Sequence, residues 1–114
     1  MHELGIMESA VQSAISSAYS RGKNKIHRLV LRVGALSGVE PESLRFAFDA
    51  VSQRTIAEGA NLVLEVIPAL AYCRICDADF AAATPGIFCC PSCGHLSAEL
   101  RTGRELELAQ IEIS

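Results

Sequence analysis

Two cysteine pairs with the same internal spacing lie in the second half of the chain: Cys73 with Cys76, and Cys90 with Cys93. Two intervening residues let a single tight turn direct both sulfur atoms of a pair at one point. Two such pairs can therefore surround one tetrahedral metal ion. The spacing predicts a metal site whose ligands are these four thiolates.

The second pair carries additional turn signals. Pro91 stiffens the chain after Cys90, and Gly94 can adopt a positive φ directly after Cys93. Of the two adjacent cysteines, only Cys90 has the two-residue gap to Cys93, which identifies it as the ligand. We expect Cys89 to be a small apolar residue that continues the preceding hydrophobic run.

The identity of the metal follows from the softness of the ligands. The alternative is that the four cysteines form two disulfides. The odd total of five cysteines and the two-residue gap within each pair favour a metal site instead. Four thiolates select zinc or iron, and a closed sphere leaves no position for a substrate water, which indicates structural zinc. A rubredoxin-like iron site that carries electrons stays open at this point.

Composition and charge exclude several classes of function. The chain has 114 residues, which suits one domain or one core with a metal-stapled module, and its formal charge is −3. Residues 70–102 hold two basic and three acidic side chains, so a nucleic-acid-binding zinc ribbon is disfavoured. We find no apolar segment of membrane-spanning length, no secretory leader and no catalytic constellation. We expect a cytoplasmic protein that is not an enzyme.

The hydrophobic pattern predicts two helices and three strands. Apolar residues recur at helical spacing in 4–19 and 41–51, and strands are indicated at 26–33, 62–66 and 105–113. In the last strand the apolar positions change phase, which predicts a bulge near Ala109. We predict an α+β fold with two helices on one face of a three-stranded mixed sheet and an inserted zinc-ribbon module. Residues 1–69 and 102–114 would form the α/β domain, and 70–101 the zinc module.

A second candidate metal site lies at the start of the chain. His2 places a terminal amine, a backbone amide and an imidazole on one short stretch, where they can close adjacent chelate rings. Ni(II) or Cu(II), which favour square-planar nitrogen ligands, can displace the amide proton, and the Glu3 amide can complete the plane. The alternative is that His2 is a solvated side chain near a frayed terminus. We expect the Glu3 carboxylate to be an exposed charge that meets a docking partner.

These motifs together resemble those of a known family. Met1-His2-Glu3-Leu4 opens an amphipathic helix, and the two cysteine pairs follow late in the chain, the second as Cys-Pro-x-Cys. The combination is similar to the HypA/HybF family of hydrogenase nickel-incorporation accessory proteins, over essentially the whole chain. Cys89 is a thiol in addition to the family pattern.

The resemblance implies a nickel metallochaperone with two metal sites. It implies that Ni(II) is the transferred ion and that the two cysteine pairs hold structural zinc. The implied nickel ligands are Met1, His2 and Glu3. The implied partners are a GTPase, HypB, and the precursor of the hydrogenase large subunit, with urease maturation proteins as partners of some members.

Overall fold

The computed structural model describes residues 2–82 and 86–114. The chain divides into two compact units. The first, here called the α/β unit, consists of Met1–Arg32, Val39–Glu65 and Glu107–Ser114. The second, the cysteine unit, consists of Val33–Gly38 and Val66–Leu106. The predicted order of helix, strand, helix, strand, metal module and strand is confirmed.

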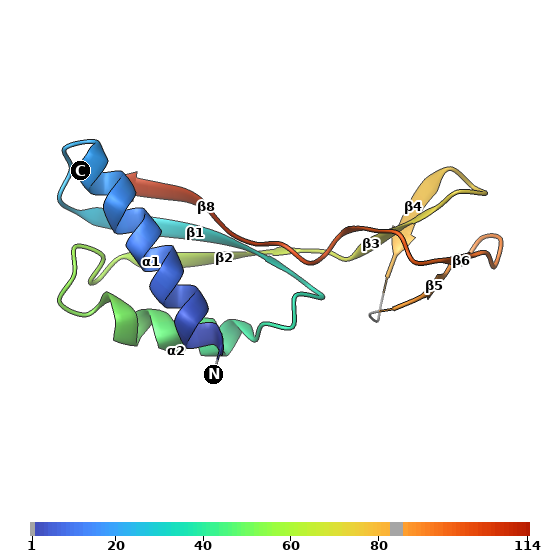
Figure 1. Cartoon of the computed structure of the whole chain (residues 1–114), viewed down its shortest axis with the longest axis horizontal. Coiled ribbons are helices and arrows are strands. Elements are labelled where there is room, and N and C mark those ends of the chain that lie inside the picture. The colour runs from blue at the N-terminus through green and yellow to red at the C-terminus, as the bar shows by residue number, and fades with distance from the viewer. Residues whose placement is uncertain (1, 83–85) are drawn as a thin grey trace. The chain divides into compact units, whose positions relative to one another are not determined.

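The α/β unit is a three-stranded mixed sheet with two helices packed on one face (Figure 1). The strands lie in the order β2 (Asn61–Ile67), β1 (Ile26–Gly34) and β8 (Leu106–Ile113). The helices are α1 (His2–Ser20) and α2 (Pro41–Ser52), and they pack against each other. This architecture is the predicted fold class.

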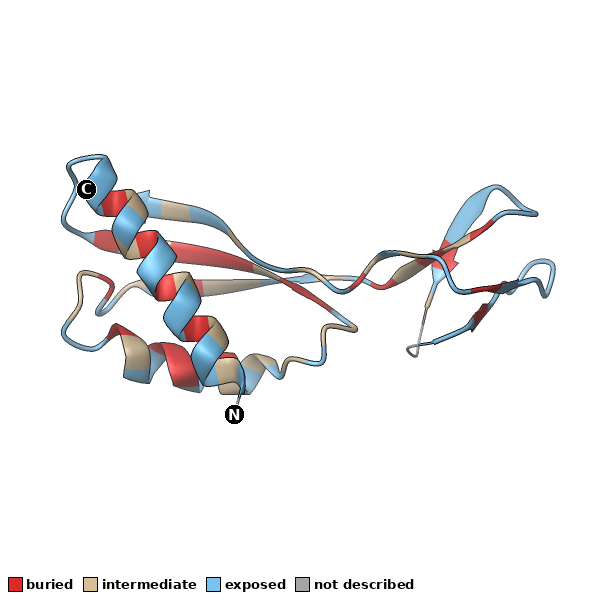
Figure 2. Cartoon of the chain, viewed as in Figure 1, coloured by how far each residue is buried: buried red, intermediate tan, exposed pale blue. Residues whose placement is uncertain are grey.

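The buried face of α1 explains why this segment is helical. Met7, Val11, Ala14 and Ala18 are buried, and their spacing of three or four residues places them on one helical face. In Figure 2 they form a red stripe along the helix, with exposed residues between them. The helix ends at Ser20, and Gly22 just beyond it takes a φ of 71°, which a glycine adopts readily.

The start of α2 also matches the sequence signals. Glu40 has extended backbone angles, and its side chain accepts a hydrogen bond from the amide of Glu42. Pro41 occupies the first helical position, where a missing amide hydrogen costs nothing. Leu44 and Phe48 then bury the inner face of the helix.

Charged side chains join the three strands of the α/β unit. Arg28 lies 3.6 Å from Glu112, and Arg32 lies 3.5 Å from Glu107 and 3.2 Å from Glu65. The two arginines are four residues apart on β1 and so share a face of the sheet. Their glutamate partners on β8 are five residues apart, an odd separation that a regular strand would place on opposite faces. Arginine and glutamate side chains can reach a diagonal neighbour, and the backbone bonds that join Lys25 to Ser114 and Gly34 to Glu105 span nine residues on each strand. The bulge near Ala109 or Gln110 therefore stays a prediction.

The cysteine unit contains short strands that the sequence pattern did not reveal. One sheet has the order β4 (Ala78–Ala81), β3 (Leu70–Cys73) and β7 (Leu100–Thr102). The other pairs β5 (Phe88–Cys89) with β6 (Leu96–Ser97) in antiparallel register. Segments of two to four residues are too short to show a period of two, so the sequence pattern predicted no strands there.

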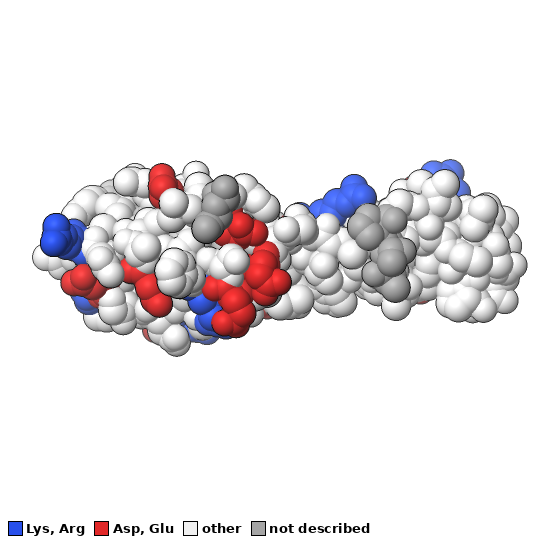
Figure 3. All heavy atoms as spheres, turned by 90° about the horizontal axis from the view of Figure 1, so that it is seen from below, with Lys and Arg blue, Asp and Glu red and all other residues white. Residues whose placement is uncertain are grey.

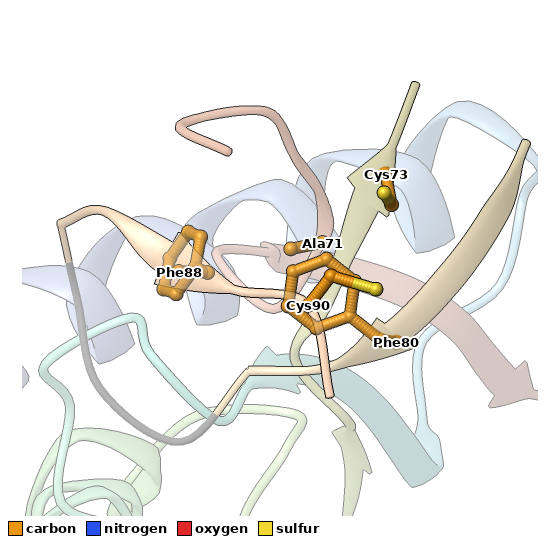
Figure 4. Packing of buried hydrophobic residues seen from close by; sticks show 5 residues of the cluster. All are labelled: Ala71, Cys73, Phe80, Phe88 and Cys90. Carbon is orange, nitrogen blue, oxygen red and sulfur yellow. The ribbon is translucent and has the colours of Figure 1, made fainter. Parts of the chain in front are cut away.

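A small apolar cluster forms the core of the cysteine unit (Figure 4). Its buried members are Ala71, Cys73, Phe80, Phe88 and Cys90. Two of these five residues are cysteines of the predicted metal site. A core of this size buries little apolar surface, so a bound metal would add substantially to the stability of the unit.

Two backbone segments of the cysteine unit cross so closely, at two glycines, that neither position has room for a side chain. A Cβ atom on Gly34 would overlap the carbonyl group of Gly103, and one on Gly103 would lie 2.7 Å from the Cα of Ala69. Near the crossing, the amide of Leu36 donates to the carbonyl of Gly103 over 2.7 Å. This contact ties residues 33–38 into the cysteine unit, which is therefore larger than the predicted module of residues 70–101.

Gly34→Ala is expected to destabilise the zinc-loaded chain by about 1–3 kcal/mol, because the backbone at the crossing has to shift. The matched control is Gly5→Ala in α1, where a Cβ atom meets nothing within 4 Å. That substitution should stabilise the chain by about 0.5–1 kcal/mol. Urea unfolding of both variants measures the difference. Equal effects would contradict the close crossing.

Candidate metal centre

The structure brings the four predicted cysteine ligands together. The sulfur atoms of Cys73 and Cys93 are 3.6 Å apart, those of Cys76 and Cys90 are 3.9 Å apart, and all four lie within 4.8 Å of one another. A tetrahedral zinc ion with Zn–S bonds of about 2.3 Å requires sulfur atoms about 3.8 Å apart. None of these cysteines forms a disulfide. The quartet therefore has the dimensions of a tetrahedral thiolate site.

Two backbone turns aim the sulfur atoms at this point. In the first turn, the amide of Cys76 donates to the sulfur of Cys73 over 3.4 Å. In the second, the amide of Gly94 donates to the Cys90 carbonyl, and the amide of Cys90 donates to the His95 carbonyl, each over 2.9 Å. Gly94 has a φ of 78°, so the glycine performs the role that the sequence suggested.

The two turns give the thiols different acidities. Backbone amides of Cys93 and then Ser92 point at the sulfur of Cys90 and lower its pKa to about 7. The thiol of Cys76 donates a hydrogen bond to the sulfur of Cys93. This bond is the largest of the effects that raise the pKa of Cys76 to about 12. The Cys90 thiol can therefore ionise near neutral pH, whereas the Cys76 thiol loses its proton only when a metal cation displaces it.

The site is partly open to solvent rather than fully buried. Cys73 and Cys90 are buried in the apolar cluster, whereas Cys76 and Cys93 are exposed. A sphere of four thiolates at such a surface position remains saturated, because all four coordination positions are taken by the protein. The arrangement suits a structural site that a partner protein could still touch.

The sequence predicted Cys89 to be a small apolar residue that continues the preceding hydrophobic run, but the structure does not bury it. Its side chain is exposed, whereas Phe88 before it and Cys90 after it are buried. Successive side chains of a strand point to opposite faces, and Cys89 takes the outward position on β5. Its sulfur contacts the carbonyl of Gly94 at 3.7 Å and stays outside the quartet.

The candidate nickel segment lies at the start of α1. Met1 is outside the described residues. His2 is the first residue of the helix, and its side chain is 64% exposed. Amides in the first turn of a helix have no acceptor within the helix, so the His2 and Glu3 backbone nitrogens are not needed to hold it together.

The expectation that Glu3 presents an exposed charge is wrong. Its side chain is only 12% exposed, and its carboxylate accepts a hydrogen bond of 3.4 Å from the amide of Glu40. The amide of Glu3 itself also donates to this carboxylate and is the main cause of its lowered pKa, against a smaller opposing effect of burial. The Glu3 carboxylate therefore ties the start of α1 to the residue that caps α2.

A protein with a helix-covered sheet in one unit and four converging cysteine sulfur atoms in the other has the architecture of a two-unit metal-binding protein. The family described as hydrogenase/urease nickel incorporation, metallochaperone, hypA matches residues 1–113. The chain belongs to this HypA family of nickel-incorporation metallochaperones.

Individual relatives agree with this assignment. A hydrogenase maturation factor HypA of a Picosynechococcus species is 43% identical over 114 residues, covering 99% of both chains. A factor of the same name from Acidithiobacillus ferrooxidans is 38% identical over 113 residues, with 99% of both chains covered. The solution structure of the Ni metallochaperone HypA from Helicobacter pylori has a TM-score of 0.68 at 20% identity, covering 97% of this chain and 96% of that one. This last similarity shows the fold.

Zinc affinity is expected to fall as the pH falls, because each thiol has to lose its proton to become a ligand. Cys90, with a pKa of about 7, loses its proton first, whereas Cys76, with a pKa of about 12, stays protonated until the metal displaces the proton. We expect at least a tenfold loss of affinity per unit between about pH 8 and 6. Competition with a chromophoric chelator measures it.

Two cysteine variants provide the control for this experiment. Cys93→Ser should lose tight zinc binding, whereas Cys89→Ser should retain it, because the Cys89 sulfur stays outside the quartet. Tight zinc binding by Cys93→Ser with unchanged stability would show that the quartet is not a structural zinc site.

Proposed function

We propose that this protein binds Ni(II) at its first three residues and delivers it to the precursor of the hydrogenase large subunit. Membership of the HypA family carries the proposal. In this scheme the cysteine quartet holds structural zinc, and nickel is the cargo. The protein is a metal carrier and performs no catalysis of its own.

The chemistry of the first residues supports a nickel site. The proposed ligands are the Met1 amine, the His2 amide and imidazole, and the Glu3 amide, which together form a square-planar nitrogen set. The His2 imidazole is exposed, and the two amides lie in the first helical turn, where amides have no backbone acceptor within the helix. A terminal site also suits delivery, since its ligands can be exchanged one at a time.

The charge around the two helices favours a cation. Residues 2–20 and 40–52 together carry five acidic side chains and one basic side chain, Arg45. The acidic residues are Glu3, Glu8, Glu40, Glu42 and Asp49. Figure 3 shows acidic side chains gathered on this face of the α/β unit. A negative field of this kind raises the local concentration of a divalent cation.

The proposed partners follow from the family. They are the GTPase HypB and the hydrogenase large-subunit precursor, together with urease maturation proteins if a urease is served. We place the protein in the cytoplasm, where these factors act, and propose no contact with nucleic acid or membrane. Across the described residues, no helix combines the length and apolar character that a membrane crossing requires.

His2→Ala is expected to abolish stoichiometric nickel binding while zinc content and folding are retained, because the imidazole is exposed and outside the core. An N-terminal extension should have the same effect, since it converts the terminal amine into an amide. Isothermal titration of the zinc-loaded, untagged chain with Ni(II) measures both.

The chain provides matched controls for this titration. His27→Ala and His95→Ala remove the two other histidines, and both variants should bind nickel with unchanged affinity. Unaltered affinity of the extended protein, or loss of binding in a control variant, would place the nickel site elsewhere. A coloured protein containing iron as isolated would instead favour the electron carrier.

A further inference from the structure

The outer face of α2 carries an exposed aromatic ring. Phe46 is 74% exposed, more than any other large hydrophobic residue within residues 2–82 and 86–114. Two positions before and after it, Leu44 and Phe48 are buried and supply the inner face of the helix. The Phe46 ring therefore adds nothing to the core and is available for contact with another molecule.

Two carboxylates flank this ring on the helix surface. Residues three or four positions apart are neighbours on a helix, so Glu42 precedes and Asp49 follows Phe46 along one exposed face. These three residues are here called the outer stripe. Figure 3 views the α/β unit from the side of α2 and shows acidic side chains gathered there. The stripe is thus an aromatic ring between two negative charges.

The one basic side chain of α2 is bound elsewhere. Arg45 donates from Nη1 to the carbonyl of Leu62 over 3.4 Å. It forms no ion pair with Glu42 or Asp49, and neither of these acids is ion-paired within the described part of the chain. Nor does any described cation lie over the Phe46 ring. The charge of the stripe is therefore left for a partner to neutralise.

An aromatic face between two carboxylates fits the side chain of an arginine. A guanidinium group is planar, so it can stack on the ring while its N–H groups donate to carboxylates at the edge. The ammonium group of a lysine is a compact point charge without this geometry. A central aromatic residue with a charged rim is also the usual composition of a protein–protein contact.

The outer stripe begins beside the proposed nickel segment. The amide of Glu40 donates to the Glu3 carboxylate over 3.4 Å, and Phe46 follows Glu40 by six residues, about 9 Å along the helix axis. A protein that covers Phe46 is therefore close enough to reach the first residues of the chain. The sequence placed the docking charge at Glu3; the exposed carboxylates of α2 are better placed to meet a partner.

We propose that the outer stripe of α2 is the docking surface for the nickel acceptor, the precursor of the hydrogenase large subunit, and that it binds an arginine side chain of that protein. This inference rests on the proposed delivery function and adds the surface and the chemical group that serve it. The ligands of an acceptor have to reach the ion, whereas the proposed scheme sets no such requirement for the GTPase. We therefore assign the stripe to the acceptor.

Isothermal titration of the zinc-loaded, untagged chain with the purified precursor tests this surface. Wild-type binding should weaken as salt is added. Phe46→Leu should raise the dissociation constant at least fivefold, because it keeps apolar bulk but removes the ring face that attracts a guanidinium group. Phe46→Trp keeps such a face and should retain binding. The double variant Glu42→Gln, Asp49→Asn should also bind at least fivefold more weakly and with a smaller salt dependence.

Tyr19→Leu is the matched control. Tyr19 is an exposed aromatic residue of α1, 58% exposed, with no carboxylate three or four residues away. Its variant should bind the precursor as the wild type does. Nickel titration of Phe46→Leu gives a second control, since docking and cargo binding use different residues. Its nickel affinity should be unchanged.

Several outcomes would overturn the assignment. They are equal precursor affinity of Phe46→Leu and the wild type, wild-type binding that salt does not weaken, and loss of binding in Tyr19→Leu. A defect of Phe46→Leu confined to the GTPase HypB would assign the stripe to that protein instead. A wild-type chain that does not bind the precursor would contradict both the docking surface and the delivery function. Loss of nickel binding at the first residues with docking intact would contradict only the latter.

Discussion

Four sulfur atoms within 4.8 Å of one another are the constraint on which the cysteine unit depends. Thiolates at this distance repel each other, so only a bound cation allows all four to be ionised together. Two of the sulfur-bearing residues, Cys73 and Cys90, also belong to the apolar cluster with Phe80 and Phe88. The metal site and the core are therefore one structure, and loss of a ligand disturbs both.

The α/β unit depends on a different source of stability. Its core is formed by apolar residues of α1, α2 and the sheet, among them Met7, Leu29, Leu31 and Leu44, all at most 1% exposed. Two of the proposed nickel ligands, His2 and Glu3, precede this core in the chain and are not among its buried residues. In the proposed scheme, an ion would therefore be gained and released at the start of α1 without a change in the buried hydrophobic packing.

The sequence predicted those features that depend on local pattern. Both long helices, the three long strands and the convergence of the cysteine pairs follow from spacing, because periodicity and turn chemistry act over a few residues. Strands as short as β5 carry no detectable period, and the exposure of Cys89 depends on where that strand begins. The half-buried position of Glu3 depends on Glu40, 37 residues away, and no pattern in the first helix could reveal such a long-range partner.

The beginning of α1 at His2 has a consequence for how a nickel-loaded chain would be recognised. Consecutive amide nitrogens bound to one ion close a five-membered ring that holds the N–Cα–C–N torsion close to planar, about 40° away from its helical value. The proposed coordination would therefore unwind the first turn of α1 and pull the Glu3 carboxylate from the Glu40 amide. A shift in the magnetic resonance signal of the Glu40 amide would report this change. A partner could then recognise the nickel-loaded chain by a changed conformation at the start of α2, without contacting the metal.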